Sequence, residues 1–338
     1  MTHPAGGRDR GTVGLVVNPL AGRDIRRLVG AASVMPHHEK AAIARRALRG
    51  LEAAGVARVL YLPDGVGIVA AAADGLALRL ELEPLPMRPE GYASDSIEAA
   101  RRLEAAGVGA IVTLGGDGTN RAVASACGDV PLVAISTGTN NVFPAMVEGT
   151  VAGLAAGLVA CGAVPVEEVA PRAKWVEVAV GDAGDVALID AAVCRDRFRG
   201  AAAIWDPARV MAIVLSRAEP WAVGLSSIGG RLRPVAADEP AGLYVELATP
   251  SERHTHAHVV RAVIAPGLLA DVPVRDVRVL ALGEEVILHA EGGIVALDGE
   301  RELHSSIPVV ARVTAAGPRV VDVRRVLARS AGLGIAAW

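Results

Sequence analysis

The first part of the chain alternates continuous apolar runs with segments whose apolar residues recur at helical spacing. Residues 11–19 ("GTVGLVVNP") and 56–64 ("VARVLYLPD") are apolar almost throughout, which is typical of strands buried on both faces of a parallel sheet. Between them, residues 38–55 place apolar side chains at helical spacing and end on a glycine, a common helix terminator. The pattern therefore predicts a strand–helix–strand unit at the start of the chain.

The alternation continues as far as residue 136. Helices are expected near 66–79, over 94–107 and from Thr119 onward, and strands are expected over 80–86, 109–116 and 130–136. Five strands that alternate with helices predict a doubly wound parallel α/β domain, which we assign to residues 1–160.

Beyond about residue 165, apolar runs follow one another without long helical segments between them. These strand-like segments lie at 175–181, 186–194, 209–216, 243–249, 258–267, 277–283, 285–291, 294–300 and 309–317. They predict a β-sandwich-like domain over residues 161–315. Residues 324–338 are again helix-like, and we expect the C-terminal segment, residues 316–338, to pack back on the first domain.

Composition and charge argue against a nucleic-acid partner. Of 338 residues, 52% are hydrophobic and only 3% are aromatic, so few aromatic side chains are available for stacking on single-stranded nucleic acid. The formal net charge is −3 and the arginines are scattered among acidic residues, whereas nucleic-acid binding needs clustered basic charge.

Cysteine spacing and hydropathy predict a cytoplasmic protein without a membrane partner. Cys127, Cys161 and Cys194 are far apart in the sequence, so neither a disulfide framework nor a zinc site is indicated. The N-terminal residues lack an apolar signal-peptide core. The most apolar helix-like run, residues 151–164, is shorter than the roughly 20 residues that span a bilayer.

A glycine-rich stretch, "GGDGT" at 115–119, follows the fourth predicted strand. In parallel α/β sheets, ligands bind beyond the carboxyl ends of the strands, which is where this stretch must lie. Residues without a Cβ atom let phosphate oxygens approach the backbone N–H groups, and the helix expected from Thr119 would point its positive end at the same place. A phosphate-binding loop is therefore predicted.

Asp117 needs a separate explanation, because a carboxylate repels phosphate. It would accept a proton from an attacking hydroxyl, or hold Mg²⁺ beside the phosphates. The alternative is that Asp117 and Gly118 form only a tight turn. A helix-like segment rather than an alternating strand follows, which favours the functional interpretation.

Several motifs together resemble the superfamily of NAD kinases and diacylglycerol- or sphingosine-type lipid kinases. "GGDGT" and "VAISTGTNNVF" (133–143) look like its paired glycine-rich signature, and "NPLAGRD" (18–24) resembles its first-strand turn. Three segments of the second half resemble motifs of its β domain: "ALID" (187–190), "IAPGLLADVPV" (264–274) and "ALDGE" (296–300). The chain is most similar to the AcoX-like branch of ATP-NAD kinases.

This resemblance implies a role for each residue of the motifs. Asp117 would be the general base that takes the proton from the ribose 2′-hydroxyl of NAD. The nucleotide would be bound by Asn18, Gly115, Gly116, Gly118, Thr119, Gly138, Thr139, Asn140 and Asn141. The acceptor would be bound by Asp190, Asp298 and Glu300, with Asp190 on the ribose hydroxyls. ATP, Mg²⁺ and NAD as a substrate are implied, and no residue of the chain is assigned as a metal ligand.

The sequence departs from the NAD kinase pattern in the segments assigned to the acceptor. Ile189 stands where NAD kinases have Asn, a "TGSTAY" stretch is missing, and "IAPG" lacks the His that usually follows the Pro. Residues 298–300 match the Asp-Gly-Glu of lipid kinases better, and a hairpin turn explains them equally well. An ATP-NAD kinase is expected, with a lipid or small-molecule kinase or a non-catalytic nucleotide sensor as alternatives. We expect small-molecule nucleotide substrates and a homo-oligomer.

Other candidate residues have simpler interpretations. His254, His256 and His258 alternate and would share one face of a strand, but no carboxylate or cysteine completes a metal site by spacing. His37 and His38 are expected on an exposed loop.

Overall fold

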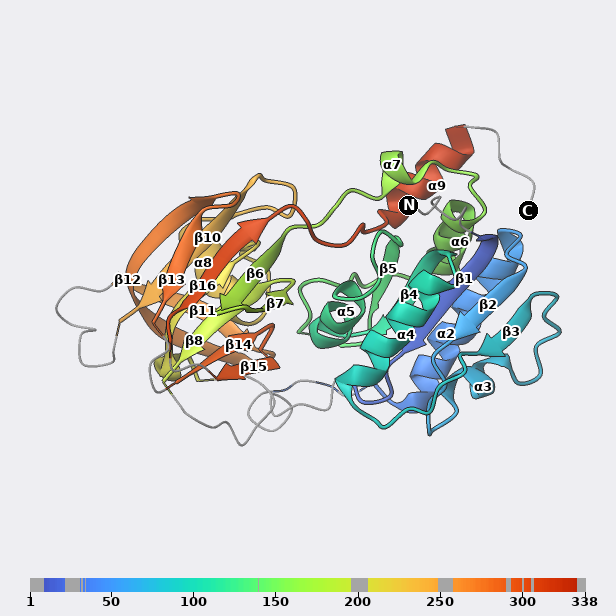
Figure 1. Ribbon diagram of the computed structural model, residues 1–338, viewed down its shortest axis with the longest axis horizontal. Helices are drawn as coiled ribbons and strands as arrows, with labels where there is room; N and C mark the ends of the chain where they lie inside the picture. The colour runs from blue at the N-terminus through green and yellow to red at the C-terminus, as the bar shows by residue number, and fades with distance from the viewer. Residues whose placement is uncertain are drawn as a thin grey trace.

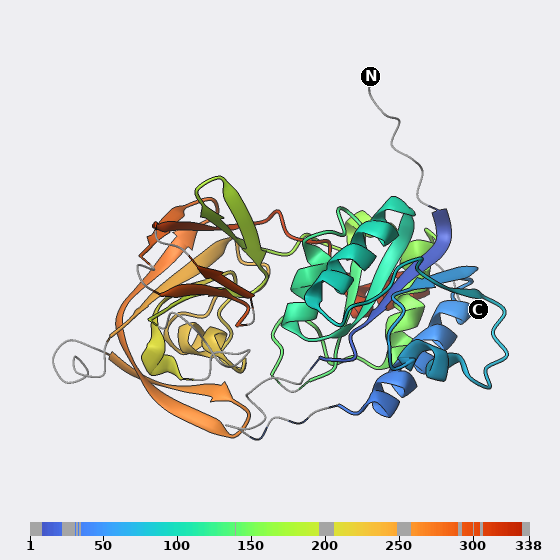
Figure 2. The same cartoon turned by 60° about the horizontal axis from the view of Figure 1, so that its bottom comes forward.

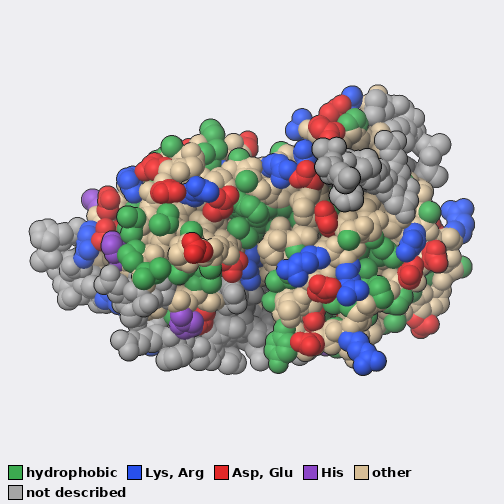
Figure 3. Space-filling view, viewed as in Figure 1, with side chains coloured by type: hydrophobic (Ala, Val, Ile, Leu, Met, Phe, Trp, Pro, Cys, Tyr) green, Lys and Arg blue, Asp and Glu red, His purple; other side chains and the backbone are tan. Residues whose placement is uncertain are grey.

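The computed structural model describes residues 9–21, 31, 33, 35–138, 140–195, 206–248, 258–289, 293–299, 301–304 and 307–332. They form two domains that lie side by side along the long axis of the molecule (Figure 1). The face seen in Figure 3 carries acidic and basic side chains interspersed over both domains, so neither domain presents a single-sign field on that face.

The first domain is built on a five-stranded parallel sheet in the order β3-β2-β1-β4-β5. Its strands are β1 (Asp9–Val17), β2 (Arg58–Tyr61), β3 (Glu81–Pro84), β4 (Val108–Gly115) and β5 (Leu132–Ser136). β4 and β5 are buried along their whole length, as expected for strands covered on both faces. The doubly wound α/β class predicted from the sequence is confirmed.

Helices cover both faces of this sheet. They are α2 (His37–Ala53), α3 (Ile68–Ala73), α4 (Ala93–Ala105), α5 (Asp117–Ala124), α6 (Gly149–Ala160), α7 (Val166–Val169) and α9 (Val323–Gly332). One core joins the sheet to α2, α3, α6 and α9, and contains Leu15 and Val326. The other core joins it to α4 and α5, and contains Val16 and Leu103. Neighbouring residues of β1 thus point to opposite faces, as the strand period of two requires.

Two helices differ from the sequence prediction. α5 begins at Asp117 rather than Thr119, because Gly116 is extended at the N-cap and an acid in the first turn suits the positive end of a helix. α3 spans Ile68–Ala73 instead of 66–79. The Asp64 carboxylate accepts hydrogen bonds from Val66 N–H and from Ile68 N–H, at the start of this helix, and Gly75, with φ 66°, follows its end.

The second domain contains two antiparallel sheets, which confirms a β-sandwich-like arrangement after the α/β domain. One sheet has the order β11-β12-β10-β9-β8-β14-β15 and the other β13-β16-β6-β7. The strands are β6 (Trp175–Val180), β7 (Ala183–Ala187), β8 (Asp190–Cys194), β9 (Val210–Leu215), β10 (Ala241–Leu247), β11 (His258–Ala265), β12 (Leu268–Ala281), β13 (Glu285–Leu288), β14 (Ile294–Leu297), β15 (Arg301–His304) and β16 (Val309–Thr314).

The second domain has three layers. An apolar core that includes Val178, Val214 and Val309 lies between the two sheets. On the other side of the larger sheet, α8 (Leu225–Leu232) packs against β9 to β12, where it is enclosed by the curved strands in Figure 2. The short helix η1 (Pro207–Arg209) precedes β9.

The strand predicted over 186–194 is in fact two strands. β7 and β8 are separated at Leu188 and Ile189 and belong to different sheets. The break could not be recognised from the apolar pattern, because both residues are apolar and are buried in the core of the first domain. In addition, β12 extends from Leu268 through the predicted gap before 277, and neither β15 nor α8 was predicted.

Two chain segments connect the domains and pair with each other. Ala173 N–H donates to Pro318 O at 2.8 Å, and Val320 N–H donates to Pro171 O at 3.0 Å. Leu132 of β5 then pairs with Val320, so the returning chain lies against the edge of the first sheet before α9. The outgoing and returning segments run side by side between the domains in Figure 1.

Candidate functional site

A cavity of about 620 Å³ lies at the carboxyl ends of the parallel strands. Its walls come from the segments that follow all five strands, within residues 18–21, 62–66, 89–96, 116–122 and 137–141, and from His37 of α2. The volume is within the range of small-molecule sites, and the position is where ligands bind in open parallel sheets. It is therefore the candidate ligand site.

Asn18 fixes the turn that follows β1. Its Oδ1 accepts a hydrogen bond from Leu20 N–H at 2.8 Å, which shapes the turn locally. Its Nδ2 donates to Thr119 Oγ1 at 2.8 Å. The turn after β1 is thereby tied to the first turn of α5, which follows β4.

Lys40 supports the same turn from behind. Its side chain is 1% exposed, and Nζ donates to the carbonyl oxygens of Asn18, Pro19 and Ala21 at 3.0 to 3.1 Å. A buried ammonium needs such compensation, and here it places a positive charge behind the cavity wall. The neighbouring His37 Nε2 lies 3.2 Å from Pro19 O. His37 is therefore the first residue of α2 beside the cavity, and not part of an exposed loop as predicted.

The glycines after β4 are required by close packing. A Cβ atom on Gly115 would lie 2.5 Å from Thr119 Cβ, and one on Gly116 would lie 2.8 Å from Asn141 Oδ1. Both distances are shorter than real Cβ contacts, so a side chain at either position would push the glycine turns apart. Gly118 and Thr119, in the first turn of α5, line the cavity, where orphan N–H groups of a helix start can meet an anion.

The turn after β5 is held by its own side chains. Ser136 Oγ donates to Gly138 O at 2.9 Å and accepts from Asn141 Nδ2 at 2.8 Å. Asn140 lines the cavity with Gly138 and Asn141, whereas Thr139 lies outside the described residues.

Asp117 ties the two glycine turns together. Its carboxylate accepts hydrogen bonds from Val142 N–H at 3.1 Å and from Phe143 N–H at 2.8 Å. Asp117 does not belong to the residues that line the cavity. The structure thus gives this carboxylate a positioning role between β4 and β5, and its role as a general base stays a prediction.

Asp298 holds the break between β7 and β8 from the β14–β15 hairpin. Its carboxylate accepts hydrogen bonds from the N–H groups of Leu188 at 2.8 Å, Ile189 at 2.7 Å and Asp190 at 3.2 Å. The residue has φ 48°, the left-handed conformation of a tight hairpin turn. Asp298 and Asp190 both lie outside the cavity lining, and Glu300 is outside the described residues.

Charged groups of the two domains meet at this boundary. The pKa of Asp298 is raised to about 6: burial raises it most, the hydrogen bond from Leu188 N–H opposes that shift, and the negative charge of Asp117 adds to it. Arg217, which follows β9, places its guanidinium 5.4 Å from the centre of the Phe143 ring. Burial lowers the pKa of Arg217, and the charges of Glu219 and Asp117 oppose that shift.

Two buried polar atoms beside the cavity have no hydrogen-bond partner within the described ranges. They are Arg121 Nε, on α5, and Thr137 Oγ1, directly after β5. The two residues are 6% and 1% exposed, and both line the cavity. Leaving a buried polar group unsatisfied costs about 1–3 kcal/mol, so a ligand that bonds to these atoms would recover that cost.

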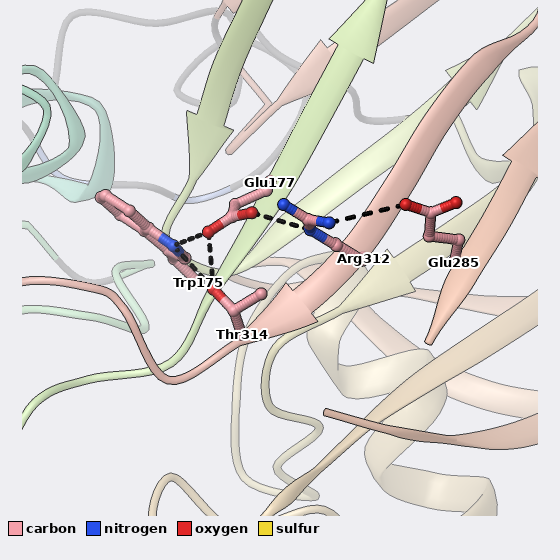
Figure 4. A network of polar contacts seen from close by, with 5 residues as sticks. All are labelled: Trp175, Glu177, Glu285, Arg312 and Thr314. Atoms are coloured by element: carbon pink, nitrogen blue, oxygen red, sulfur yellow. Dashed lines mark hydrogen bonds and ion pairs between the residues drawn. The ribbon is translucent and has the colours of Figure 1, made fainter. Parts of the chain in front are cut away.

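A second cavity, of about 480 Å³, lies between the end of α5 and the four-stranded sheet. Glu177, one of its lining residues, accepts hydrogen bonds from Trp175 Nε1, Thr314 Oγ1 and Arg312 Nε (Figure 4). Burial would raise the pKa of Glu177, but these hydrogen bonds lower it overall. Arg312 also pairs with Glu285 at 3.5 Å. The network therefore braces three neighbouring strands.

The cavity brings together most of the predicted nucleotide residues and separates them from the predicted acceptor residues. Predicted residues that line it are Asn18, Gly116, Gly118, Thr119, Gly138, Asn140 and Asn141. Gly115, Asp117, Asp190 and Asp298 are placed behind it or at the domain boundary. Of the alternating histidines, only His258 is described, at the start of β11, and the described residues contain no group of three possible metal ligands.

Some residues beside the cavity have positions that only the fold reveals. In the sequence, Lys40 lies within the helix-like segment 38–55, and Thr137 directly follows the strand expected over 130–136. Arg121 lies two residues after the glycine-rich stretch 115–119, so its position close to that stretch was a usable signal. Tyr92, which is 72% exposed at the cavity, has no signal in the sequence.

These features define a kinase-like protein class. Residues 13–163 match the model of the ATP-NAD kinase N-terminal domain, so the chain has an NAD kinase-like kinase fold. Residues 174–315 match the model of the acetoin catabolism protein X C-terminal domain. The chain is 40% identical over 317 residues to acetoin catabolism protein X from Cupriavidus necator, which covers 90% of this chain and 88% of the relative. It belongs to the acetoin catabolism protein X family, and the resemblance stated from the sequence is confirmed.

Two solved structures are similar over most of the chain. An NAD kinase from Archaeoglobus fulgidus in complex with ATP is 17% identical, covers 81% of this chain and 96% of its own, and gives a TM-score of 0.41. A proposed diacylglycerol kinase from Bacillus anthracis str. Sterne is 14% identical, covers 92% and 97%, and gives a TM-score of 0.42. Helices in the described part of this chain are all too short or too polar to cross a membrane.

Proposed function

We propose that the protein is an ATP-dependent kinase, with the ribose 2′-hydroxyl of NAD as the acceptor. The observation that carries the proposal is the cavity of about 620 Å³ at the carboxyl ends of the five strands. Both glycine turns and the start of α5 line it, which is the arrangement that backbone N–H groups need to bind phosphates. The match to the ATP-NAD kinase N-terminal domain supports the same chemistry.

Phosphoryl transfer asks a protein mainly for positioning and for neutralisation of charge. In this proposal, the N–H groups around Gly118 and Thr119 bind the phosphates, and the turn held by Asn18 and Lys40 closes the cavity behind them. Asp117 accepts the proton of the acceptor hydroxyl from its position between the glycine turns and the domain boundary.

The described residues suit a Mg²⁺ ion that is carried by the nucleotide. They contain no group of three possible protein ligands, and Mg²⁺ commonly binds through one or two carboxylates together with substrate phosphates and waters. When bound, the ion would neutralise phosphate charge. Holding this ion beside the phosphates would be the alternative role of Asp117, in place of proton acceptance.

The acceptor is proposed to bind at the boundary of the two domains. Asp190, at the start of β8, is 8% exposed and sits beside the Asp298 hairpin. Its carboxylate would accept hydrogen bonds from ribose hydroxyls of NAD, which requires the dinucleotide to extend from the cavity to this boundary. A lipid or small alcohol has no such ribose, so Asp190 separates the acceptor classes.

A non-catalytic nucleotide sensor is the second candidate. It is favoured by the hydrogen bonds that Asp117 and Asp298 accept from backbone N–H groups, since such carboxylates serve the fold whether or not chemistry occurs.

The test is a set of titrations with ATP, NAD, NADH and a lipid head group, read as protection against thermal unfolding, with product assayed in parallel. ATP and NAD are expected to protect the wild type. Asp190→Ala is expected to weaken NAD binding by roughly ten- to a hundredfold while ATP binding is retained. No NAD binding by the wild type would discard NAD as the acceptor, and binding without product would support the sensor.

A further inference from the structure

Arg121 is a buried cation whose hydrogen-bonding capacity is largely unused. It lies on α5, one helical turn after Asp117, and 6% of its surface is exposed. A guanidinium carries five N–H donors in a planar fork. Its Nε has no hydrogen-bond partner within the part of the chain that the structure describes, and the residue lines the cavity.

The partner that Arg121 does have is held loosely. Its Nη1 atom lies 3.4 Å from Asp185 Oδ1, whereas charge-assisted N–H···O bonds are typically about 2.7–2.9 Å long. Asp185 lies on β7, in the second domain, and its side chain is 20% exposed at the second cavity. The ion pair therefore keeps the charge of Arg121 compensated without using its whole fork.

Thr137 supplies a second unused group in the same cavity. Its hydroxyl is buried and unpartnered in the described structure, directly after β5. A hydroxyl and a guanidinium together are suited to a phosphate group, because both donate hydrogen bonds and one carries positive charge. The lining segments containing Gly118 and Gly138 lie beside them, so one chain of phosphates could meet both turns and these two side chains.

We propose that Arg121 and Thr137 form a subsite for a phosphate group of a polyphosphate ligand, and that Asp185 competes with that phosphate for Arg121. The inference rests on the proposed function in taking a nucleotide as the natural ligand. It links ligand binding to the domain boundary, because phosphate binding at Arg121 draws its guanidinium away from a strand of the second domain.

The test uses inorganic tripolyphosphate and ATP as probes, with adenosine as a ligand that lacks phosphate. Calorimetric titrations are made on the wild type and on Arg121→Met, Arg121→Lys and Thr137→Val. Arg121→Met is expected to weaken tripolyphosphate and ATP binding by roughly ten- to a hundredfold and to leave adenosine binding unchanged. Arg121→Lys keeps the charge but loses the fork, so it is expected to restore only part of the affinity.

Two further variants separate binding from folding. Thr137→Val replaces an unpartnered buried hydroxyl by a methyl group of similar shape, so the melting temperature without ligand should stay equal or rise while affinity for tripolyphosphate falls. Asp185→Asn removes the competing charge and is expected to tighten tripolyphosphate binding. A purely structural role for Arg121 and Thr137 would change melting temperatures without this pattern.

The outcomes also separate this inference from the proposed function. If tripolyphosphate affinity depends on Arg121 but the protein phosphorylates no acceptor, the subsite is supported and the proposed kinase function is rejected. If ATP binding and turnover are equal in the wild type, Arg121→Met and Thr137→Val, the proposed kinase function is retained and the subsite is overturned. Failure of the wild type to bind tripolyphosphate would overturn it as well.

Discussion

At the scale of single residues, acids of the two domains approach each other where the domains meet. Asp117 ties two turns of the first domain, and Asp298 ties a strand break of the second. Each carboxylate is stabilised by backbone N–H groups, yet the charge of Asp117 raises the pKa of Asp298. Each of these acids thus stabilises its own domain, while the negative charges of the two acids repel each other.

The raised pKa of Asp298 predicts a pH dependence of stability. Its ordinary pKa is 3.8 and its folded value is about 6. Between these values the folded protein holds a proton that the unfolded chain has released, so the free energy of unfolding falls as pH rises from about 4 to 6. The wild type should therefore gain on the order of 2 kcal/mol relative to Asp298→Asn when the pH is lowered from 7 to 4.

Denaturant unfolding of both proteins at a series of pH values measures this difference. Parallel pH profiles for wild type and Asp298→Asn would show that Asp298 does not titrate in this window.

Asp117→Asn tests whether this residue does more than position the glycine turns. A general base predicts a loss of turnover of roughly 10²-fold or more with ATP affinity nearly retained. A purely positioning role predicts that ATP affinity and turnover fall together, because the Asn141 turn loses its anchor at Val142 and Phe143. Single-turnover rates and ATP calorimetry on the same variant distinguish the two, and wild-type turnover in a folded variant would remove Asp117 from the chemistry.

At the scale of elements, the glycine turns after β4 and β5 act as one unit. A Cβ atom on Gly138 would lie 3.1 Å from Asn141 Nδ2, and one on Gly116 would lie 2.8 Å from Oδ1 of the same side chain. The two turns meet at one asparagine side chain, so a change in either should be felt in both.

Gly138→Val is therefore expected to weaken ATP binding by at least roughly tenfold, since its branched side chain displaces Asn141 and fills space beside the phosphates. Isothermal calorimetry measures the loss. Gly332→Ala, at a position where an added Cβ meets open space, is the control and should bind ATP like the wild type. Unchanged affinity in Gly138→Val would place the phosphates elsewhere.

The sequence predicted the elements of the first domain well because their periodicity is strong. Continuous apolar runs such as 109–116 are typical of buried strands between helices, and the order of the sheet then brings the glycine turns together. The break at Leu188 and Ile189 could not be predicted. This break depends on hydrogen bonds to Asp298, which lies more than a hundred residues later in the sequence. Leu188 and Ile189 are themselves buried, so their apolar character does not reveal the break.

The candidate site was predictable only where particular residue types, above all glycine, indicate the backbone conformation. Glycines reveal turns, so the stretches at 115–119 and 137–141 could be located. No sequence pattern indicates the roles of Lys40 and Thr137, because these roles depend on the residues that surround them in the folded chain. Asp117 was found for its position, but its hydrogen bonds to Val142 and Phe143 require the β4–β5 pairing.

At the scale of the whole molecule, the domains are joined by paired connections and by contacts near the site. The connecting segments hydrogen-bond to each other at Ala173 and Pro318, and Ala31 N–H donates to Pro266 O, at the tip of the β11–β12 hairpin. Arg121 and Asp185 pair across the same boundary. A ligand that extends from the cavity to Asp190 would therefore contact both domains and stabilise their arrangement.

The most direct measurement follows the γ-phosphate itself. The wild type is incubated with NAD, Mg²⁺ and ATP labelled at the γ-phosphate, and the products are separated. The account predicts labelled NADP and an equal amount of ADP, both strongly reduced in Asp117→Asn. ADP without label on NAD, or no product from a folded protein that binds both substrates, would contradict it.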